Sequence, residues 1–438
     1  MAYSTFQGGV HPFKGKRMSK DKFILEYLPK GEVVYPLSQH IGAPAHPLVK
    51  RGDRVLVGQK IAEASGYVSA PVHASVSGTV KAIELRLTAA GQPSPCIVVE
   101  NDEWYEEVEY PPVRPLEELT RDEILELIRE AGVVGMGGAG FPTHVKLAVK
   151  NPNRIRYVIV NCSECEPYLT SDYRRMVENP DWLILGLKVM LKLFDKAVGI
   201  LAVEDHKRDA ITALQMASGN EQRMEIHVLQ TKYPQGCERM LVYACTGREI
   251  NSSMLPADVG CVVNNVDTVC AIYQAVYLGR PLTHRIVTVT GDAIADPCNF
   301  DVCMGTSYKE LVQAAGGFRR EPKKIISGGP MMGQSLASLG VPVVKTSSAL
   351  LCLSRDEVAS ANPSPCIHCG YCVTACPERL IPSKLADYAE RFQEEPFRKL
   401  YGMECMECGS CSYVCPAKRQ LTQSIRAFRR ELLAKGKK

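Results

Sequence analysis

Two cysteine runs near the C-terminal end constrain the fold of this chain more than any other feature. Each run has four cysteines with two, two and three residues between them and a proline after the last one. This is the spacing of the bacterial two-cluster [4Fe–4S] motif, in which three cysteines of a run bind one cluster and the fourth binds the other. The motif predicts two clusters with crossed ligation. One is assigned to Cys366, Cys369, Cys372 and Cys415, and the other to Cys405, Cys408, Cys411 and Cys376.

Zinc and disulfides are the alternatives for sets of four cysteines. Zinc ligands usually come as two pairs separated by a dozen or more residues, whereas each set here lies within eleven residues. The repeat in the same register favours clusters. Residues 1–10 are polar and do not resemble a secretory signal, so we expect a reducing cytoplasm, in which disulfides are rare.

The composition is that of a soluble globular protein. The chain has 438 residues, of which 45% are hydrophobic and 23% charged, and this length suggests about two to four domains. A net charge of +4 is too small to indicate nucleic-acid binding. The most apolar helical run, residues 182–194, is interrupted by Lys188 and Lys192. We therefore expect no membrane span, and contact with a membrane only through a spanning partner.

The N-terminal third is predicted to be an arm followed by a β domain. Residues 1–30 are polar and basic, and short alternating runs separated by Gly and Pro fill residues 31–110. The turn at residues 49–59 resembles that of biotinyl and lipoyl carrier domains. A carrier needs a lysine at its hairpin tip, but none lies between Ser69 and Ser77. We expect a structural barrel-sandwich without a prosthetic group, followed by an acidic, proline-rich linker.

A glycine run at residues 135–140 lies near the start of the next predicted domain, residues 116–281. It matches the dinucleotide-binding fingerprint in letters, but a helix with a Thr120–Glu123 capping box precedes it instead of a strand. An ordinary Rossmann site is therefore excluded. Glycines still let the backbone approach a flat or phosphorylated ligand, and a helix from Thr143 could direct N–H groups at an anion, with Lys146 in reach. A tight structural loop is the alternative.

Polar residues follow two further predicted elements of this domain. A buried strand over residues 155–160 leads to Asn161, Glu164 and Glu166, and ligands bind at such carboxyl ends in open α/β sheets. Cys162 and Cys165 are interpreted as small buried residues. A second group stands at a helix start and could bind phosphate or amide groups or simply cap the helix. It consists of Asn264, Asn265 and Thr268.

The C-terminal part is predicted to hold a β-grasp, SLBB-like module over residues 282–350 and the cluster domain over residues 351–438. The overall prediction is a multidomain α/β protein with a barrel-sandwich, an α/β flavin/NAD domain, a β-grasp module and an α-helical two-cluster ferredoxin-like domain. The basic amphipathic tail from Arg426 is either a solvated helix end or a contact for a partner or acidic lipid.

These segments together resemble the flavin- and NADH-binding subunit of respiratory complex I. The glycine run with residues 141–143, the 161–167 segment, the 233–238 segment and residues 263–266 recur in that order. The resemblance implies that FMN binds non-covalently at Gly135, Gly137, Gly138, Gly140, Lys146, Asn161, Asn264, Asn265 and Thr268. It implies that NAD(H) or the flavin ring lies near Glu164, Glu166, Tyr233, Gly236 and Glu238.

Several features depart from the complex I pattern. Met136 and Cys237 replace an arginine and a glutamate of that family, so nucleotide contacts are expected to differ. The second cluster motif, the N-terminal lead, the lysine-free barrel and the β-grasp module are also additional. Over essentially the full length, the chain is instead similar to the RnfC family of the Rnf electron-transport complex, an ion-translocating ferredoxin:NAD oxidoreductase.

The Rnf resemblance implies a function and a location. NADH gives two electrons as a hydride, whereas iron–sulfur clusters transfer one electron at a time. FMN can take part in both kinds of transfer. No side chain need act as a catalytic acid or base. Integral membrane and ferredoxin-like subunits would couple the flow to Na⁺ or H⁺ transport, with this chain peripheral on the cytoplasmic side. The alternatives are a soluble cobalamin reductase-type flavoprotein, which typically begins near the glycine run, and a non-catalytic iron–sulfur relay.

Overall fold

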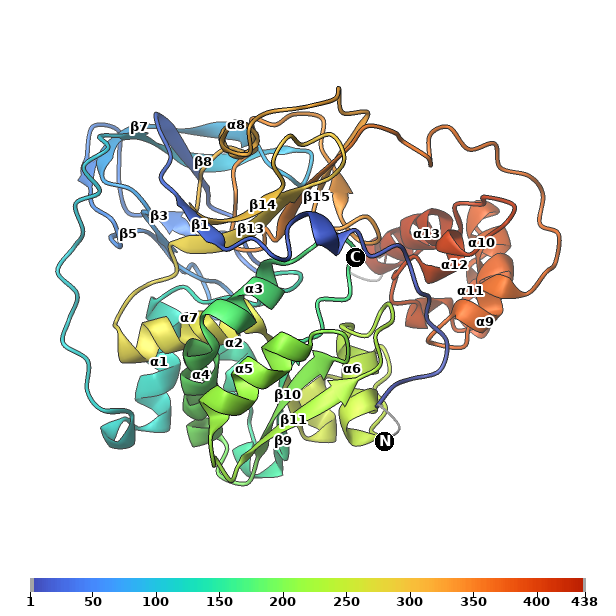
Figure 1. Cartoon of the computed structure of the whole chain (residues 1–438), viewed down its shortest axis with the longest axis horizontal. Helices are drawn as coiled ribbons and strands as arrows, with labels where there is room; N and C mark the ends of the chain where they lie inside the picture. The colour runs from blue at the N-terminus through green and yellow to red at the C-terminus, as the bar shows by residue number, and fades with distance from the viewer. Residues whose placement is uncertain (1–3, 436–438) are drawn as a thin grey trace.

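The structure, a computed structural model, describes residues 4–435 and has four connected parts (Figure 1). The first is a barrel-sandwich of two antiparallel sheets that pack around Val33, Tyr35, Ile61 and Ile97, all fully buried. Residues 69–78 are buried throughout, so this stretch offers no exposed attachment point. One sheet has the order β2 (Glu32–Pro36), β8 (Pro93–Asn101), β7 (Gly78–Leu87) and β4 (Arg54–Val55), and the other β3 (His46–Pro47), β5 (Lys60–Glu63) and β6 (Val72–His73).

The second part is an α/β domain around a parallel sheet. The strand order is β11 (Met224–Leu229), β10 (Val198–Glu204), β9 (Tyr157–Cys162) and β12 (Cys261–Asn265). Val158 and Val160 of β9 face one core and Ile159 faces the other, as expected for a strand buried on both sides. The strand ends two residues later than the sequence suggested, so Asn161 and Cys162 lie within it.

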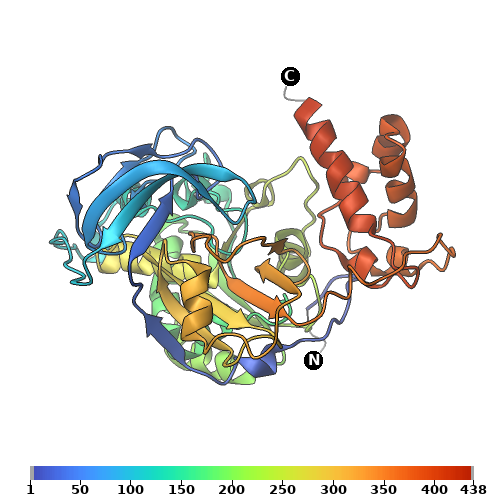
Figure 2. The same ribbon diagram turned by 90° about the horizontal axis from the view of Figure 1, so that it is seen from above.

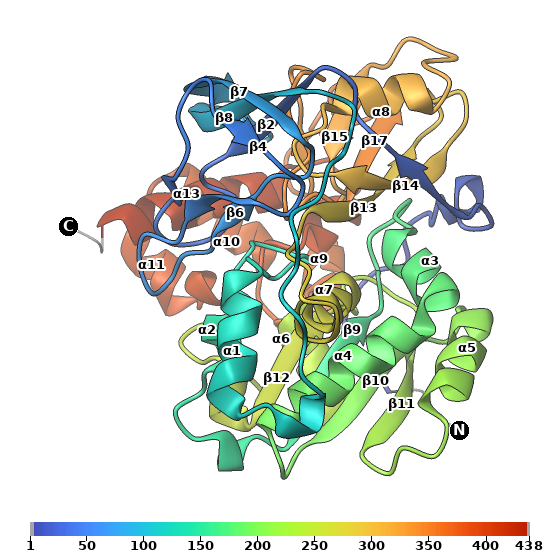
Figure 3. The same cartoon turned by 90° about the vertical axis from the view of Figure 1, so that its left-hand side faces the viewer.

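Helices cover both faces of this sheet. Figure 3 shows α4 (Pro180–Leu193), α5 (Arg208–Ser218) and α7 (Val266–Tyr277) in front of it, and their buried residues share one core with α1 (Arg121–Glu130). Residues of α6 (Glu238–Thr246) pack on the opposite face. Two shorter helices, α2 (Thr143–Leu147) and α3 (Ser171–Glu178), lie near the carboxyl edge of the strands. The predicted capping box of α1 is present, with the Thr120 amide donating to Glu123 at 2.8 Å.

The third part is a six-stranded mixed sheet with α8 (Tyr308–Ala314) against it. The N-terminal arm is more than an extended lead, because its residues form β1 and pair in parallel with β14. The last long strand ends at Leu353, slightly beyond the predicted limit of the β-grasp module. The strand order is β1 (Ile24–Tyr27), β14 (Cys298–Cys303), β13 (His284–Thr290), β17 (Ala349–Leu353), β15 (Lys324–Ser327) and β16 (Gln334–Ser335).

The fourth part is a helical domain that holds both cysteine runs and lies at one end of the molecule (Figure 2). Its core includes Phe397 and Phe428, whose rings pack edge to face at 5.1 Å. Within residues 4–435, no helix is both long and apolar enough to cross a membrane. The helices are α9 (Tyr371–Ala375), α10 (Pro382–Glu390), α11 (Glu394–Lys399), α12 (Ser410–Tyr413) and α13 (Leu421–Lys435).

Candidate functional site

The glycine run forms a loop between α1 and α2 that is held against the start of α7. The Gly135 amide donates to the Phe141 carbonyl at 2.8 Å, which closes the loop. A Cβ atom at Gly137 would lie 2.8 Å from Cβ of Asn265, closer than side chains normally approach. A Cβ at Gly138 would have no atom of the described residues within 4 Å. The loop therefore packs tightly on one side and leaves an open face at Gly138, which suits the approach of a flat or phosphorylated ligand.

Three of the polar residues assigned to FMN by resemblance gather around this loop. The Asn265 side chain accepts from the Asp267 amide at 2.9 Å, so it is the N-cap of α7, and its Nδ2 donates to Asp172 at 2.6 Å. The Thr268 hydroxyl accepts from the Met136 amide at 2.9 Å. Lys146 Nζ donates to the Val263 carbonyl at 2.7 Å and to Glu238 at 3.0 Å. Gly140, at φ 72°, completes the loop.

Asn264 is placed differently from its neighbour. Its side chain is buried, and its Nδ2 lies 3.3 Å from the sulfur of Met190 in the core. The strand alternation at the end of β12 explains this, since successive side chains point to opposite faces of the sheet.

The end of β9 meets the turn after β11. Asn161 Nδ2 donates to the Gly236 carbonyl at 2.8 Å, and a Cβ at Gly236 would lie 3.2 Å from the Cys165 sulfur. Gln235, which directly precedes Gly236, is fully buried. Neither polar atom of its carboxamide has a hydrogen-bond partner within residues 4–435. A buried unpaired amide costs about 1–3 kcal/mol. No local sequence pattern marks Gln235, although it lies between the assigned Tyr233 and Gly236.

The orphaned Gln235 amide and the open face at Gly138 test whether the residues present fit a flavin. A flavin offers a phosphate, hydroxyl groups and a ring with donors and acceptors, and the site offers a glycine loop, a lysine and the unpaired Gln235 carboxamide. The residues therefore fit such a group. A buried carboxamide that has both a free donor and a free acceptor can pair with a donor–acceptor edge of a ring.

Of the two acidic residues after β9 that the resemblance placed near the nucleotide, Glu164 is buried and Glu166 is half-buried. The carboxylate of Glu164 accepts from the Asp172 amide at 2.8 Å and lies 3.5 Å from the ammonium of Lys16, which belongs to the N-terminal arm. Glu166 accepts from the Met331 and Met332 amides at 3.2 and 2.8 Å. Burial raises the pKa of Glu166 from 4.5 to about 7, because the charged form loses hydration that two amides only partly replace.

Tyr233 connects the α/β domain to the cluster domain. Its hydroxyl donates to the Cys408 carbonyl at 2.6 Å, and its ring is buried with Val10, Ala375 and Cys408. The turn of residues 233–236 therefore contacts Asn161 through Gly236 and a cysteine of the second run through Tyr233.

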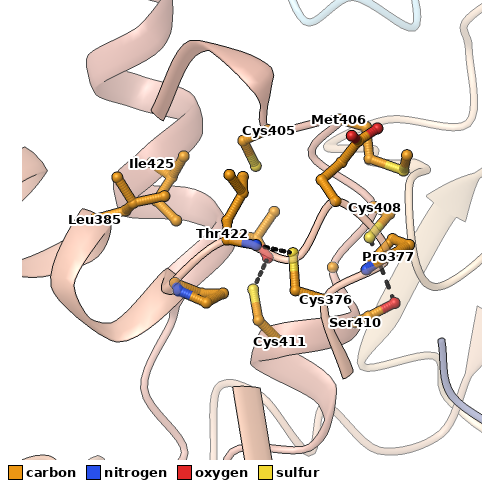
Figure 4. Close-up of a pocket in the computed structure, with 14 residues that line it drawn as sticks. Cys376, Pro377, Leu385, Cys405, Met406, Cys408, Ser410, Cys411, Thr422 and Ile425 are labelled. Atoms are coloured by element: carbon orange, nitrogen blue, oxygen red, sulfur yellow. Dashed lines mark hydrogen bonds between the residues drawn. The ribbon is translucent and has the colours of Figure 1, made fainter. Parts of the chain in front are cut away.

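Four cysteines from both runs line one pocket of about 370 Å³ in the cluster domain (Figure 4). Three come from the second run and Cys376 comes from the first, which is the set that crossed ligation assigns to one cluster. Apolar side chains such as Leu385 and Ile425 line the same pocket. No three His, Cys, Asp or Glu side chains in the described part of the chain are close enough to share a single ion. The cysteines are Cys376, Cys405, Cys408 and Cys411.

The chemistry of these thiols fits a metal cluster. Burial raises the pKa of Cys376 to about 12 and that of Cys405 to about 11, so the thiolates need a compensating positive charge. A metal centre supplies that charge and binds cysteine as thiolate. The Leu380 amide donates to the Cys376 sulfur and the Glu407 amide to the Cys405 sulfur, each at 3.4 Å. Such bonds tune the potentials of iron–sulfur clusters.

The other predicted set lies nearer the surface. Cys372 is buried and Cys415 is half-buried against the core of the domain, whereas Cys369 is exposed. Ile367 and Tyr371, which flank Cys369, are also exposed. The two predicted clusters therefore differ in solvent access.

Family models match four parts of the chain. They describe a Nuo51 FMN-binding domain at residues 128–274, an RnfC barrel sandwich hybrid domain at 4–104, an SLBB domain at 286–335 and a 4Fe-4S dicluster domain at 365–418. These matches confirm the predicted multidomain fold class. The limits that we assigned to each domain stay predictions.

Relatives match over the full length. The chain is 44% identical to the C subunit of the Na(+)-translocating ferredoxin:NAD(+) oxidoreductase complex of Acetobacterium woodii, over 100% of this chain and 99% of the relative. It is also 44% identical to the proton-translocating counterpart of Clostridium ljungdahlii, over 99% and 95%. A solved NAD⁺-reducing [NiFe]-hydrogenase shares the fold, with a TM-score of 0.50 and 20% identity over 73% of this chain and 62% of that chain.

Proposed function

The chain belongs to the RnfC family, which is part of the ion-translocating ferredoxin:NAD oxidoreductase complexes known as Rnf, and we propose that it is the NAD(H)-oxidising and NAD(H)-reducing subunit of such a complex. It passes electrons between NAD(H), FMN and two [4Fe–4S] clusters. Other subunits couple this flow to ion movement. The relatives named for Na⁺ and for protons are equally similar to this chain, so similarity does not select the ion.

One observation carries this proposal: the turn that contacts Asn161 near the end of β9 is in direct contact with a cluster-binding loop. Asn161 holds the Gly236 carbonyl, and Tyr233 of the same turn holds the Cys408 carbonyl at 2.6 Å. When bound, FMN supplies the exchange between hydride transfer and single-electron transfer. The protein contributes the positions of the redox groups and the exclusion of water.

The site residues follow from this proposal. Lys146 provides positive charge for the flavin phosphate, and Asn265 and Thr268 hold the glycine loop in the shape that admits it. The FMN set that the resemblance implies is Gly135, Gly137, Gly138, Gly140, Lys146, Asn161, Asn264, Asn265 and Thr268, of which Asn264 turns its side chain to the core at Met190. Glu164, Glu166, Tyr233, Gly236 and Glu238 shape the nucleotide side, and the eight cysteines of the two runs bind the clusters.

We place the protein at the cytoplasmic side of the cell membrane, docked on the integral subunits of the complex. NAD(H) and ferredoxin are cytoplasmic reactants, and a protein that exchanges electrons with them has to be accessible from that side.

An anaerobic NADH titration of the isolated, cluster-reconstituted chain tests the function. We expect stoichiometric FMN to bleach on NADH addition and reduced-cluster signals to appear by electron paramagnetic resonance. If clusters are present but no flavin binds and NADH changes nothing, the glycine loop is scaffold and the chain is a relay between other subunits.

A further inference from the structure

The N-terminal segment, residues 4–16, forms a strap between the α/β domain and the cluster domain (Figures 1 and 2). Ser4 forms a parallel bridge with Leu229 at the end of β11. Val10 and Tyr233 exchange two backbone hydrogen bonds of 2.8 and 2.9 Å. Further along, Lys16 donates to the Glu164 carbonyl at 2.8 Å. The strap is therefore fastened along the carboxyl edge of the parallel sheet.

Two glycines of the strap fit between Tyr233 and the first cysteine run. The Gly9 amide donates to the Ala375 carbonyl at 3.0 Å. Gly8 and Gly9 have φ angles of 81° and 83°, which favour glycine. A Cβ at Gly8 would lie 2.9 Å from the Cys376 carbonyl oxygen, and one at Gly9 would lie 2.8 Å from the Tyr233 carbonyl oxygen. The backbone is thus closely packed on both sides at this point.

A lysine and an apolar cluster hold the strap in this position. Lys232 lies 3.9 Å above the Phe6 ring, and its ammonium donates to the carbonyls of Phe6 and Gly8. Val10 packs with Tyr233 and Cys408 in one buried cluster. The strap therefore contacts both loops that contribute cysteines to the pocket of Cys376, Cys405, Cys408 and Cys411.

We propose that the strap fixes the position of the cluster bound by Cys376, Cys405, Cys408 and Cys411 against the flavin domain, so that this cluster is the one that exchanges electrons with the flavin site. This inference rests on the proposed function. NADH releases two electrons and a proton as it becomes NAD⁺, and the two clusters accept one electron each. The cluster near the exposed Cys369 is then reached second and faces the partner subunits.

A Gly8→Ala variant tests this positioning role, with Gly31→Ala as the matched control. Both glycines have similar φ angles, 81° and 76°, but a Cβ at Gly31 has no atom of the described residues within 4 Å. Each full-length protein is loaded with FMN and clusters and mixed with NADH without oxygen. Flavin bleaching is followed by stopped-flow absorbance and cluster reduction by freeze-quench electron paramagnetic resonance. Amide hydrogen exchange over residues 370–380 and 403–414 reports the packing of the cluster loops.

We expect Gly8→Ala to bleach flavin at the wild-type rate, to reduce the clusters several-fold more slowly, and to exchange faster in both segments. Gly31→Ala should match wild type in all three. Wild-type rates of cluster reduction in Gly8→Ala, with unchanged exchange, would overturn the inference. If Gly8→Ala fails to fold, Lys232→Met removes the bonds to the strap without adding atoms and should slow cluster reduction in the same way. A wild-type rate of cluster reduction in Lys232→Met would also overturn the inference. A wild-type protein whose flavin does not respond to NADH would instead overturn the proposed function.

Discussion

A buried lysine at the meeting point of three domains gives a quantitative prediction. Lys345 lies between β16 and β17, and its amine is fully buried. It donates to the Pro71 carbonyl of the barrel-sandwich at 2.6 Å and to the Gly132 carbonyl of the α/β domain at 2.7 Å. Burial lowers the pKa of Lys345 from 10.5 to about 7, because two neutral carbonyls do not replace the hydration of an ammonium.

The sign of the pH effect follows from these two pKa values. Between pH 7 and 10.5 the unfolded chain holds a proton on Lys345 that the folded chain lacks, so raising the pH favours the folded state. The contribution approaches about 1 kcal/mol per pH unit, or about 2–3 kcal/mol in all from about pH 7.5 to about pH 9.5. Lys345→Met has a side chain of similar length that does not titrate. The difference in free energy of unfolding, wild type minus variant, should therefore rise by about this amount.

Measuring the difference removes the other titrations. Burial raises the pKa of thiols such as Cys162, so these groups lower the free energy of unfolding as the pH rises. They do so equally in both proteins, and the effect cancels in the difference. His40 and His73, whose pKa values are lowered to about 4 and about 3, titrate below this window. Urea unfolding followed by the fluorescence of Trp104 and Trp182 reports on the domains that Lys345 joins, since the cluster domain has no tryptophan. A difference that stays flat or falls between these pH values would refute the buried, neutral amine.

Further predictions concern the cofactor sites. Cys366→Ser and Cys415→Ser should each lose the same cluster signal in electron paramagnetic resonance, and Cys376→Ser should lose the other; loss of different clusters in the first two variants would contradict crossed ligation. Gly137→Ala should destabilise even the flavin-free protein by about 1–3 kcal/mol in thermal unfolding, because its Cβ collides with Asn265. Gly138→Ala, whose Cβ meets no atom of the described residues, should leave that stability unchanged and weaken FMN binding in a fluorescence titration; unchanged FMN affinity would show that the open face at Gly138 does not receive the flavin.

Sequence patterns predicted the features that depend on neighbours along the chain. The Thr120–Glu123 capping box was predictable, and capping was one of the two roles open for Asn265, because a helix end is completed by side chains within three residues. The cysteine spacing was readable for the same reason, since one loop presents three ligands to one cluster. The residues assigned to the flavin and nucleotide were implied by the order of these segments and stay predictions.

Only the tertiary structure decided which distant segments meet. Tyr233 and Cys408 lie 175 positions apart, and Lys345 and Pro71 lie 274 apart. β1 has its two central residues exposed and no alternation, so its pattern did not mark it as a strand, yet it pairs with β14. Local patterns encode hydrogen bonds that each segment makes with itself. Contacts between domains depend instead on which buried polar groups find hydrogen-bond partners, and which backbones fit closely together, once the whole chain has packed. No single segment of the sequence carries that information.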